Sequence, residues 1–138
     1  TAFRAGNFGF NLDTLDALVS NGLRYDSSYN ACRMGTTSGL CPGSLLTEPM
    51  RHGEVVEYPV TVFLDGLRRP RPLQINACSW GEMERVLWAA QESGRTSVVI
   101  VSHSFELLDG SRTRPDPTAI RRFTTLCNFL DRHRDVFR

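Results

Sequence analysis

The sequence contains no lysine. This and other absences exclude several classes of function. All 16 basic residues are arginine, and the 15 acidic residues leave a formal net charge of only +1. A chain so close to neutral lacks the surplus of positive charge with which proteins bind nucleic acid or anionic membranes. It also has no apolar run long enough to cross a bilayer. We therefore expect no nucleic-acid partner and no membrane span.

Cysteine patterns that bind metal are absent as well. The 4 cysteines, at positions 32, 41, 78 and 127, include no Cys-x-x-Cys pair and match no zinc-module spacing. Cys32 and Cys41 flank a loop rich in Gly, Ser and Thr and are candidates for a disulfide. Cys127 falls on the apolar face of an expected helix and is interpreted as a core residue. The sequence shows no signal-peptide pattern, and the compartment, cytoplasmic or periplasmic, stays open.

The residues that are present are typical of one globular domain with alternating strands and helices. A length of 138 residues, with 41% apolar and 22% charged residues, suits such a domain. The expected strands cover residues 2–4, 23–27, 54–64 and 96–101, with a short strand or an extended linker at 73–77. The expected helices cover residues 11–21, 79–93 and 117–133. This alternation favours a parallel α/β sheet or barrel.

The same periodicity predicts which side chains are buried. In the strand 54–64, one face would carry Val56, Tyr58, Val60 and Val62. In the helix 117–133, the inward residues would be Ile120, Phe123, Leu126, Cys127 and Leu130. Residues 29–53 show little periodicity and are expected to be irregular, and residues 135–138 look like the beginning of a further strand.

Three polar residues stand at the ends of expected strands: Arg4, Asp26 and His103. Parallel strands bring their carboxyl ends to one edge of a sheet, where α/β folds build active sites. A cation, a carboxylate and an imidazole at that edge favour acid–base chemistry on a polar substrate. Two structural alternatives stay open: Arg4 and Asp26 form an ion pair that closes the sheet, and His103 is a structural hydrogen-bonding residue.

Five stretches come in the order found in polysaccharide deacetylases. They are residues 3–9 (FRAGNFG), the Leu-spaced helix 12–18, and residues 22–28 (GLRYDSS), 58–61 (YPVT) and 101–107 (VSHSFEL). The chain thus resembles the NodB-homology domain, a distorted (β/α) barrel that removes N-acetyl groups from sugars. The resemblance implies that residues 1–138 are one partial domain, carrying the third to fifth motifs of the family and part of its barrel.

The resemblance also implies a role for each residue of these motifs. Arg4 would orient the catalytic carboxylate, although Ala5-Gly6-Asn7 replaces the usual Pro spacing after it. A backbone N–H of Asn7 or Phe8 would help to hold the oxyanion of the substrate. His103 would protonate the departing amine, and Asp26 would tune that histidine.

The first two motifs of the family are missing. In the family, an Asp pair and a His-x-x-x-His hold a divalent metal, usually zinc, but the 3 histidines here include no such pair. The resemblance therefore implies that the metal-binding half lies upstream, outside this chain. A half-barrel would expose its apolar flanks, so we expect the rest of the barrel, or self-association, to cover them.

Several other residues have two interpretations. Trp80 precedes a helix and is a candidate platform for stacking on a sugar, whereas Trp88 is expected to pack in the core. Glu106 is a candidate acid behind the site residues, and its other interpretation, a helix-start residue, is favoured. The Arg-rich segment 68–71 is interpreted as a solvated turn. The predicted function is removal of N-acetyl groups from a bacterial surface polysaccharide or its precursor. The alternative is a non-catalytic domain that binds carbohydrate or protein.

Overall fold

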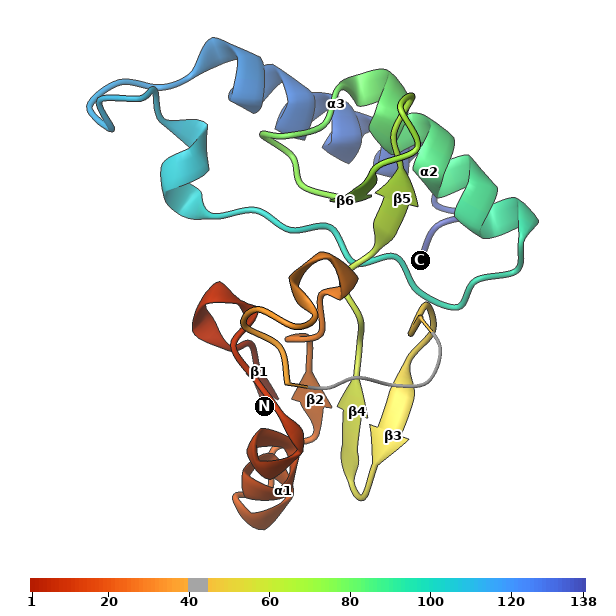
Figure 1. Cartoon of the computed structure of the whole chain (residues 1–138). Coiled ribbons are helices and arrows are strands. Elements are labelled where there is room, and N and C mark those ends of the chain that lie inside the picture. The colour runs from red at the N-terminus through yellow and green to blue at the C-terminus, as the bar shows by residue number, and fades with distance from the viewer. Residues whose placement is uncertain (40–44) are drawn as a thin grey trace. The chain divides into compact units, whose positions relative to one another are not determined.

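The computed structural model describes residues 1–39 and 45–138, which form two compact units (Figure 1). Unit 1 comprises Thr1–Pro72 and Arg95–Val99, and unit 2 comprises Leu73–Gly94 and Ile100–Arg138. The predicted α/β class is confirmed, since the described residues contain a sheet with parallel strands and three α-helices. They form no closed barrel. None of the helices in the described part is long and apolar enough to span a bilayer.

Unit 1 contains a four-stranded sheet in the order β1-β2-β4-β3 (Figure 1). The strands are β1 (Ala2–Phe3), β2 (Tyr25–Asp26), β3 (Met50–His52) and β4 (Val55–Glu57). The β1–β2 and β2–β4 pairs are parallel, whereas β3 runs antiparallel to β4. The prediction for β1 and β2 is confirmed. β3 lies inside the segment 29–53, for which the sequence predicts no regular structure.

Helix α1 (Leu12–Ser20) matches its prediction because its end signals are local. Asn11 and Thr14 form a capping box at its beginning, and Gly22 adopts a positive φ of 67° just after its end. Leu15 and Leu18 point from the helix into the core of unit 1. That core also contains Phe10, Tyr29 and Val55.

The single strand predicted for residues 54–64 is wrong, because the structure divides it into β4 and β5 (Val62–Leu64). Pro59 lies at the break, where it has no N–H to donate to a ladder. Beyond it, Val60 N–H donates to the Tyr29 carbonyl, and the chain leaves the sheet. β5 then pairs with β6 (Pro70–Pro72) in an antiparallel hairpin. Arg68 and Arg69 of the predicted turn lie in the turn of this hairpin, whereas Arg71 lies in β6, opposite Phe63.

The face predicted for this strand is wrong within β4, although Val60 of that face is buried beyond the break. β4 buries Val55 and Glu57 completely, while Val56 and Tyr58 are half-buried. The strand is therefore turned by one residue relative to the prediction. A carboxylic acid, rather than a second apolar side chain, enters the interior of unit 1.

Unit 2 is built on helices α2 (Trp80–Glu92) and α3 (Pro117–Arg132), and both match their predictions. A capping box of Ser79 and Glu82 opens α2, and the Asp116 side chain caps α3. The ring of Phe129 on α3 contacts the rings of Trp80, Trp88 and Phe137 at centroid distances of 5.3, 5.6 and 5.5 Å. These aromatic rings form the core between the two helices, which confirms the packing role of Trp88.

Two details of α3 differ from the prediction. Its buried residues are Ala119, Leu126 and Phe129, while Ile120, Phe123 and Cys127 are exposed. The contacts of Phe129 with the two indoles rotate the helix, so that the stripe through Ile120, Phe123 and Cys127 turns away from the core. Cys127 is therefore a surface residue, and the prediction that it lies in the core is wrong.

Two predicted strands do not form in the described structure. Residues 96–101 make only an isolated bridge, between Val101 and Gln74, and separate hydrogen bonds such as that from Thr61 N–H to the Val99 carbonyl. Residues 135–138 complete a turn after α3, in which Val136 N–H and Phe137 N–H donate to the His133 carbonyl. The Phe137 ring is instead used for packing against Trp88.

The rotation of α3 predicts a sharp difference between two phenylalanines of the same helix. Replacing Phe129 by Ala removes the ring at the centre of the aromatic core and should lower the free energy of unfolding by about 3–5 kcal/mol. Replacing the exposed Phe123 by Ala should cost about 1 kcal/mol or less. Urea denaturation of both variants measures this difference, and equal losses would contradict the observed orientation of the helix.

Candidate functional site

Arg4 follows β1 and binds the loop that follows β2. Its Nε donates to the Ser27 carbonyl at 2.9 Å, and its Nη2 donates to the Ser27 hydroxyl at 2.8 Å. The Ser27 hydroxyl in turn donates to the Tyr58 carbonyl at 2.7 Å. Arg4 thus links the ends of β1, β2 and β4, and it contacts the residue next to Asp26. The side chain remains exposed, as a substrate-facing cation requires.

Asp26 is almost entirely buried, with 1% of its surface exposed. Its Oδ1 accepts hydrogen bonds from Ser27 N–H at 2.8 Å and from the Ser28 hydroxyl at 2.6 Å. The Ser28 hydroxyl also accepts Ala5 N–H at 2.8 Å, which ties this group to the chain after β1. The structure therefore brings Arg4 and Asp26 to one edge of unit 1, as predicted. His103 belongs to unit 2.

Glu57 is the residue that the sequence interpretation missed. In the parallel pairing of β2 and β4 it lies opposite Asp26, and none of its surface is exposed. Burial, together with the hydrogen bond and the charge of Asp26, raises the pKa of Glu57 to about 8, against the lowering effect of Tyr29 N–H and Ser28 N–H. The available signal was its spacing from Val55, because residues two apart on a strand share a face.

The loop between Arg4 and α1 has a strained backbone. Asn7 and Phe8 lie in a short 3-10 helix, Gly6–Phe8, with positive φ angles of 53° and 54°. Such conformations are rare for a bulky residue and cluster at functional sites. Phe8 N–H already donates to the Ala5 carbonyl at 3.3 Å. Of the two predicted oxyanion donors, the geometry therefore favours the exposed Asn7.

His103 is held by a carboxylate within unit 2. Its Nδ1 lies 3.2 Å from Oε1 of Glu106, and its backbone N–H donates to Oε2 of the same residue at 3.1 Å. The Gln74 amide fixes Glu106 in turn by donating to Oε1. The imidazole is 48% exposed, whereas the Glu106 side chain is 9% exposed. With Nδ1 oriented in this way, Nε2 is the nitrogen placed for proton exchange with a substrate.

An aromatic ring supports this histidine. The His103 imidazole stacks on Phe105 at a centroid distance of 5.1 Å and an interplanar angle of 25°. The Arg112 guanidinium lies 4.8 Å from the centroid of the same ring. The sequence interpretation assigned no role to Phe105 or Arg112. Phe105 lies two residues after the motif histidine, and Arg112 lies in a polar loop. The expected helix-start role of Glu106 is confirmed, since the short helix Ser104–Leu107 begins after His103.

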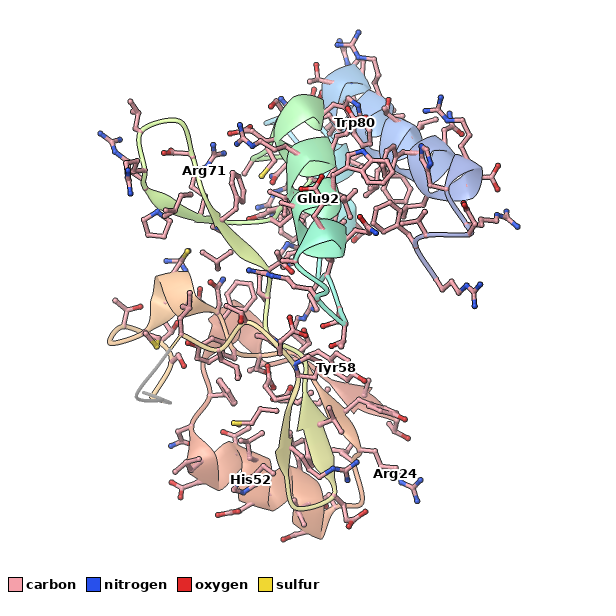
Figure 2. All side chains as sticks on the ribbon, turned by 90° about the vertical axis from the view of Figure 1, so that its right-hand side faces the viewer. Arg24, His52, Tyr58, Arg71, Trp80 and Glu92 are labelled. Atoms are coloured by element: carbon pink, nitrogen blue, oxygen red, sulfur yellow. The ribbon has the colours of Figure 1, made fainter. Side chains whose placement is uncertain are left out.

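Trp80 lies at the beginning of α2, on the side that faces α3 (Figure 2). Its ring meets Phe129 edge-on at an interplanar angle of 63°, and the side chain is half-buried. This packing gives Trp80 a structural role in unit 2. Its role as a platform for a sugar stays a prediction.

The described residues do not make a metal centre. No group of three or more His, Cys, Asp or Glu side chains able to hold an ion lies together in residues 1–39 and 45–138. The zinc that the resemblance implies therefore does not fit the residues described here, and we derive no chemical step through it. The proposed Cys32–Cys41 pair involves Cys41, which lies outside the described residues.

Comparison of the chain with models of protein families, with curated proteins and with solved structures gives no match. The candidate residues therefore form two separate groups, Arg4, Asp26 and Glu57 in unit 1 and His103 and Glu106 in unit 2. Their interpretation depends on the order of the motifs and on the contacts within each group.

The contact between His103 and Glu106 predicts the tautomer of the neutral imidazole. In the wild type the proton should reside mainly on Nδ1, facing the carboxylate, and Glu106→Ala should shift it toward Nε2, the usual preference of a free imidazole ring. Nitrogen-15 NMR at alkaline pH measures the two forms. His133, whose ring packs on Trp88, serves as the internal control and should not change. An unchanged His103 spectrum in the variant would show that Glu106 does not orient the ring.

Proposed function

We propose that the protein is a hydrolase of the polysaccharide deacetylase type, which removes N-acetyl groups from a bacterial surface polysaccharide or its precursor. The observation that carries this proposal is the pairing of His103 with Glu106, which prepares a half-exposed imidazole for proton transfer. The order of the five motifs supports it. The strained Asn7–Phe8 backbone beside Arg4 supports it as well.

Amide hydrolysis needs a proton for the departing nitrogen and donors for the oxyanion. In this proposal, His103 gives its Nε2 proton to the amine as the C–N bond breaks. Glu106 keeps the Nδ1 proton in place and stabilises the imidazolium, as a triad carboxylate does. The family resemblance gives that task to Asp26, so the proposal transfers it to the carboxylate that contacts the histidine in unit 2.

The candidate electrostatic groups of the proposal belong to unit 1. Arg4 is fixed by two hydrogen bonds to Ser27 and presents a permanent positive charge beside the strained loop. The Asn7 N–H is the proposed donor to the oxyanion, where one such donor is worth roughly 10²–10³ in rate. Water activation belongs to a divalent metal in the family, and residues 1–39 and 45–138 show no group of side chains that would hold one.

The alternative function is a non-catalytic domain that binds carbohydrate or protein. One observation favours it: Asp26 is buried and its Oδ1 is occupied by Ser27 and Ser28, as in a structural residue. In that case Arg4 and His103 would be surface contacts for a bound partner.

Substitution of His103 separates the two functions. In the protein purified in its native assembly, His103→Ala should reduce deacetylation of an N-acetylated oligosaccharide by roughly 10²–10⁴-fold, the contribution of a general acid. Binding of the same oligosaccharide, measured by calorimetry, should stay nearly unchanged. His52→Gln, a change in unit 1, is the control and should leave both quantities unaffected. Parallel loss of binding and turnover would contradict the role of general acid.

A further inference from the structure

Two carboxyl side chains of unit 1 are buried side by side. Asp26 and Glu57 are register partners in the parallel pair of β2 and β4. Neighbouring strands lie about 4.8 Å apart, and side chains of paired residues project from the same face. Only 1% of Asp26 and 0% of Glu57 is exposed. Two such carboxyl groups cannot both be charged without a large cost.

The hydrogen bonds of the pair satisfy one oxygen of each carboxyl group. Oδ1 of Asp26 accepts from Ser27 and Ser28, and Oε1 of Glu57 accepts from Tyr29 N–H at 2.8 Å. Oδ2 of Asp26 and Oε2 of Glu57 are buried and have no donor. A carboxylate oxygen only accepts, so one proton between these two groups supplies the missing donor.

We propose that Asp26 and Glu57 share a single proton at neutral pH. Through this proton, Glu57 acts as a positioning residue for the segment between Asp26 and Tyr29. That segment in turn holds Arg4. Glu57 interacts with both ends of this segment, with the Asp26 carboxyl group at one end and with Tyr29 N–H at the other. Between these ends lie Ser27, which binds Arg4, and Ser28, which binds Ala5. The inference does not depend on the proposed function.

The surroundings of Glu57 favour retention of the proton. Its burial and the hydrogen bond to Asp26 are the main causes that raise its pKa from 4.5 to about 8. On the other side of β4, the residue opposite Glu57 is the uncharged Met50 of β3. The elements packed against β4 carry these other charged or titratable groups: Tyr25 on β2 and Arg24 just before it, Arg51 and His52 on β3, and Asp13 and Asp16 on α1.

His52 is the one histidine among these groups, so its contribution must be separated from that of Glu57 by a control variant. It lies beside α1, where its Nε2 contacts Asp16 at 2.7 Å (Figure 2). In the β3–β4 register it is opposite Val55, two positions from Glu57. His52→Gln therefore removes the imidazole contact with Asp16 without touching the carboxyl pair.

The proposal fixes the sign of the pH dependence. A carboxyl group whose pKa rises on folding binds its proton more tightly in the folded state. Its favourable contribution is complete below the ordinary value of 4.5 and is lost as the pH rises toward about 8. Above that value the pair carries two buried charges, and the segment that binds Arg4 should loosen.

Thermal unfolding in the His52→Gln background tests this directly. Between about pH 5 and about pH 8.5, the melting temperature should fall by at least about 4 °C. Adding Glu57→Gln should remove most of this fall, because the amide donates to Asp26 permanently while Oε1 still accepts Tyr29 N–H. Glu54→Gln, an exposed acid three residues earlier on the chain, is the matched control and should keep the slope.

Carbon-13 NMR of the glutamate carboxyl groups provides a second readout, and its main observation, the titration of Glu57, needs only the protein with native residues 26 and 57. In the protein with native residue 57, Glu57 should titrate near pH 8 and Asp26→Asn should lower that midpoint, because Asn donates to the ionised group. The Arg4 Nε–H resonance should weaken over the same pH range, and it should persist in Glu57→Gln. Titration of Glu57 near its ordinary value, or a melting slope equal in Glu57→Gln and its parent, would overturn the proposal.

Discussion

The contact between two buried carboxyl groups is the constraint on which unit 1 depends. Asp26 and Glu57 are register partners in β2 and β4. Asp26 is connected through Ser28 to Ala5, in the chain after β1, and Glu57 accepts a hydrogen bond from Tyr29 N–H. A pair of apolar residues would fill this space with less electrostatic cost. Apolar residues would not form the hydrogen bonds to the loop that binds Arg4. The polar pair therefore positions this loop, whereas apolar packing would only stabilise the sheet.

The candidate acid of unit 2 is built in a different way. Glu106 orients His103 across three residues of chain, so the histidine does not depend on unit 1 for a carboxylate partner. Gln74 and Phe105 complete its support from within unit 2. Each unit thus fixes its own candidate group through local contacts, Arg4 in unit 1 and His103 in unit 2.

The sequence predicted the features that depend on residues close together in the chain. It did not predict the features that depend on contacts between residues far apart in the chain. Capping at Asn11, Ser79 and Asp116 is local, and the three helices follow from it. The burial of Glu57 requires a partner 31 positions earlier, at Asp26, and the rotation of α3 requires the indoles of α2. For the same reason, the motif residues Arg4, Asp26 and His103 were predicted, whereas Glu57, Phe105 and Arg112, which position or support them, were not.

Native mass spectrometry of the purified protein in its natural assembly tests the proposed hydrolase most directly, because it reports chain mass, partners and bound metal together. A catalytic assembly should be heavier than this chain alone and carry about one zinc ion per complete site. A stable, metal-free species with the mass of this chain alone, binding N-acetylated glycan without hydrolysing it, would contradict the proposal and establish a binding domain.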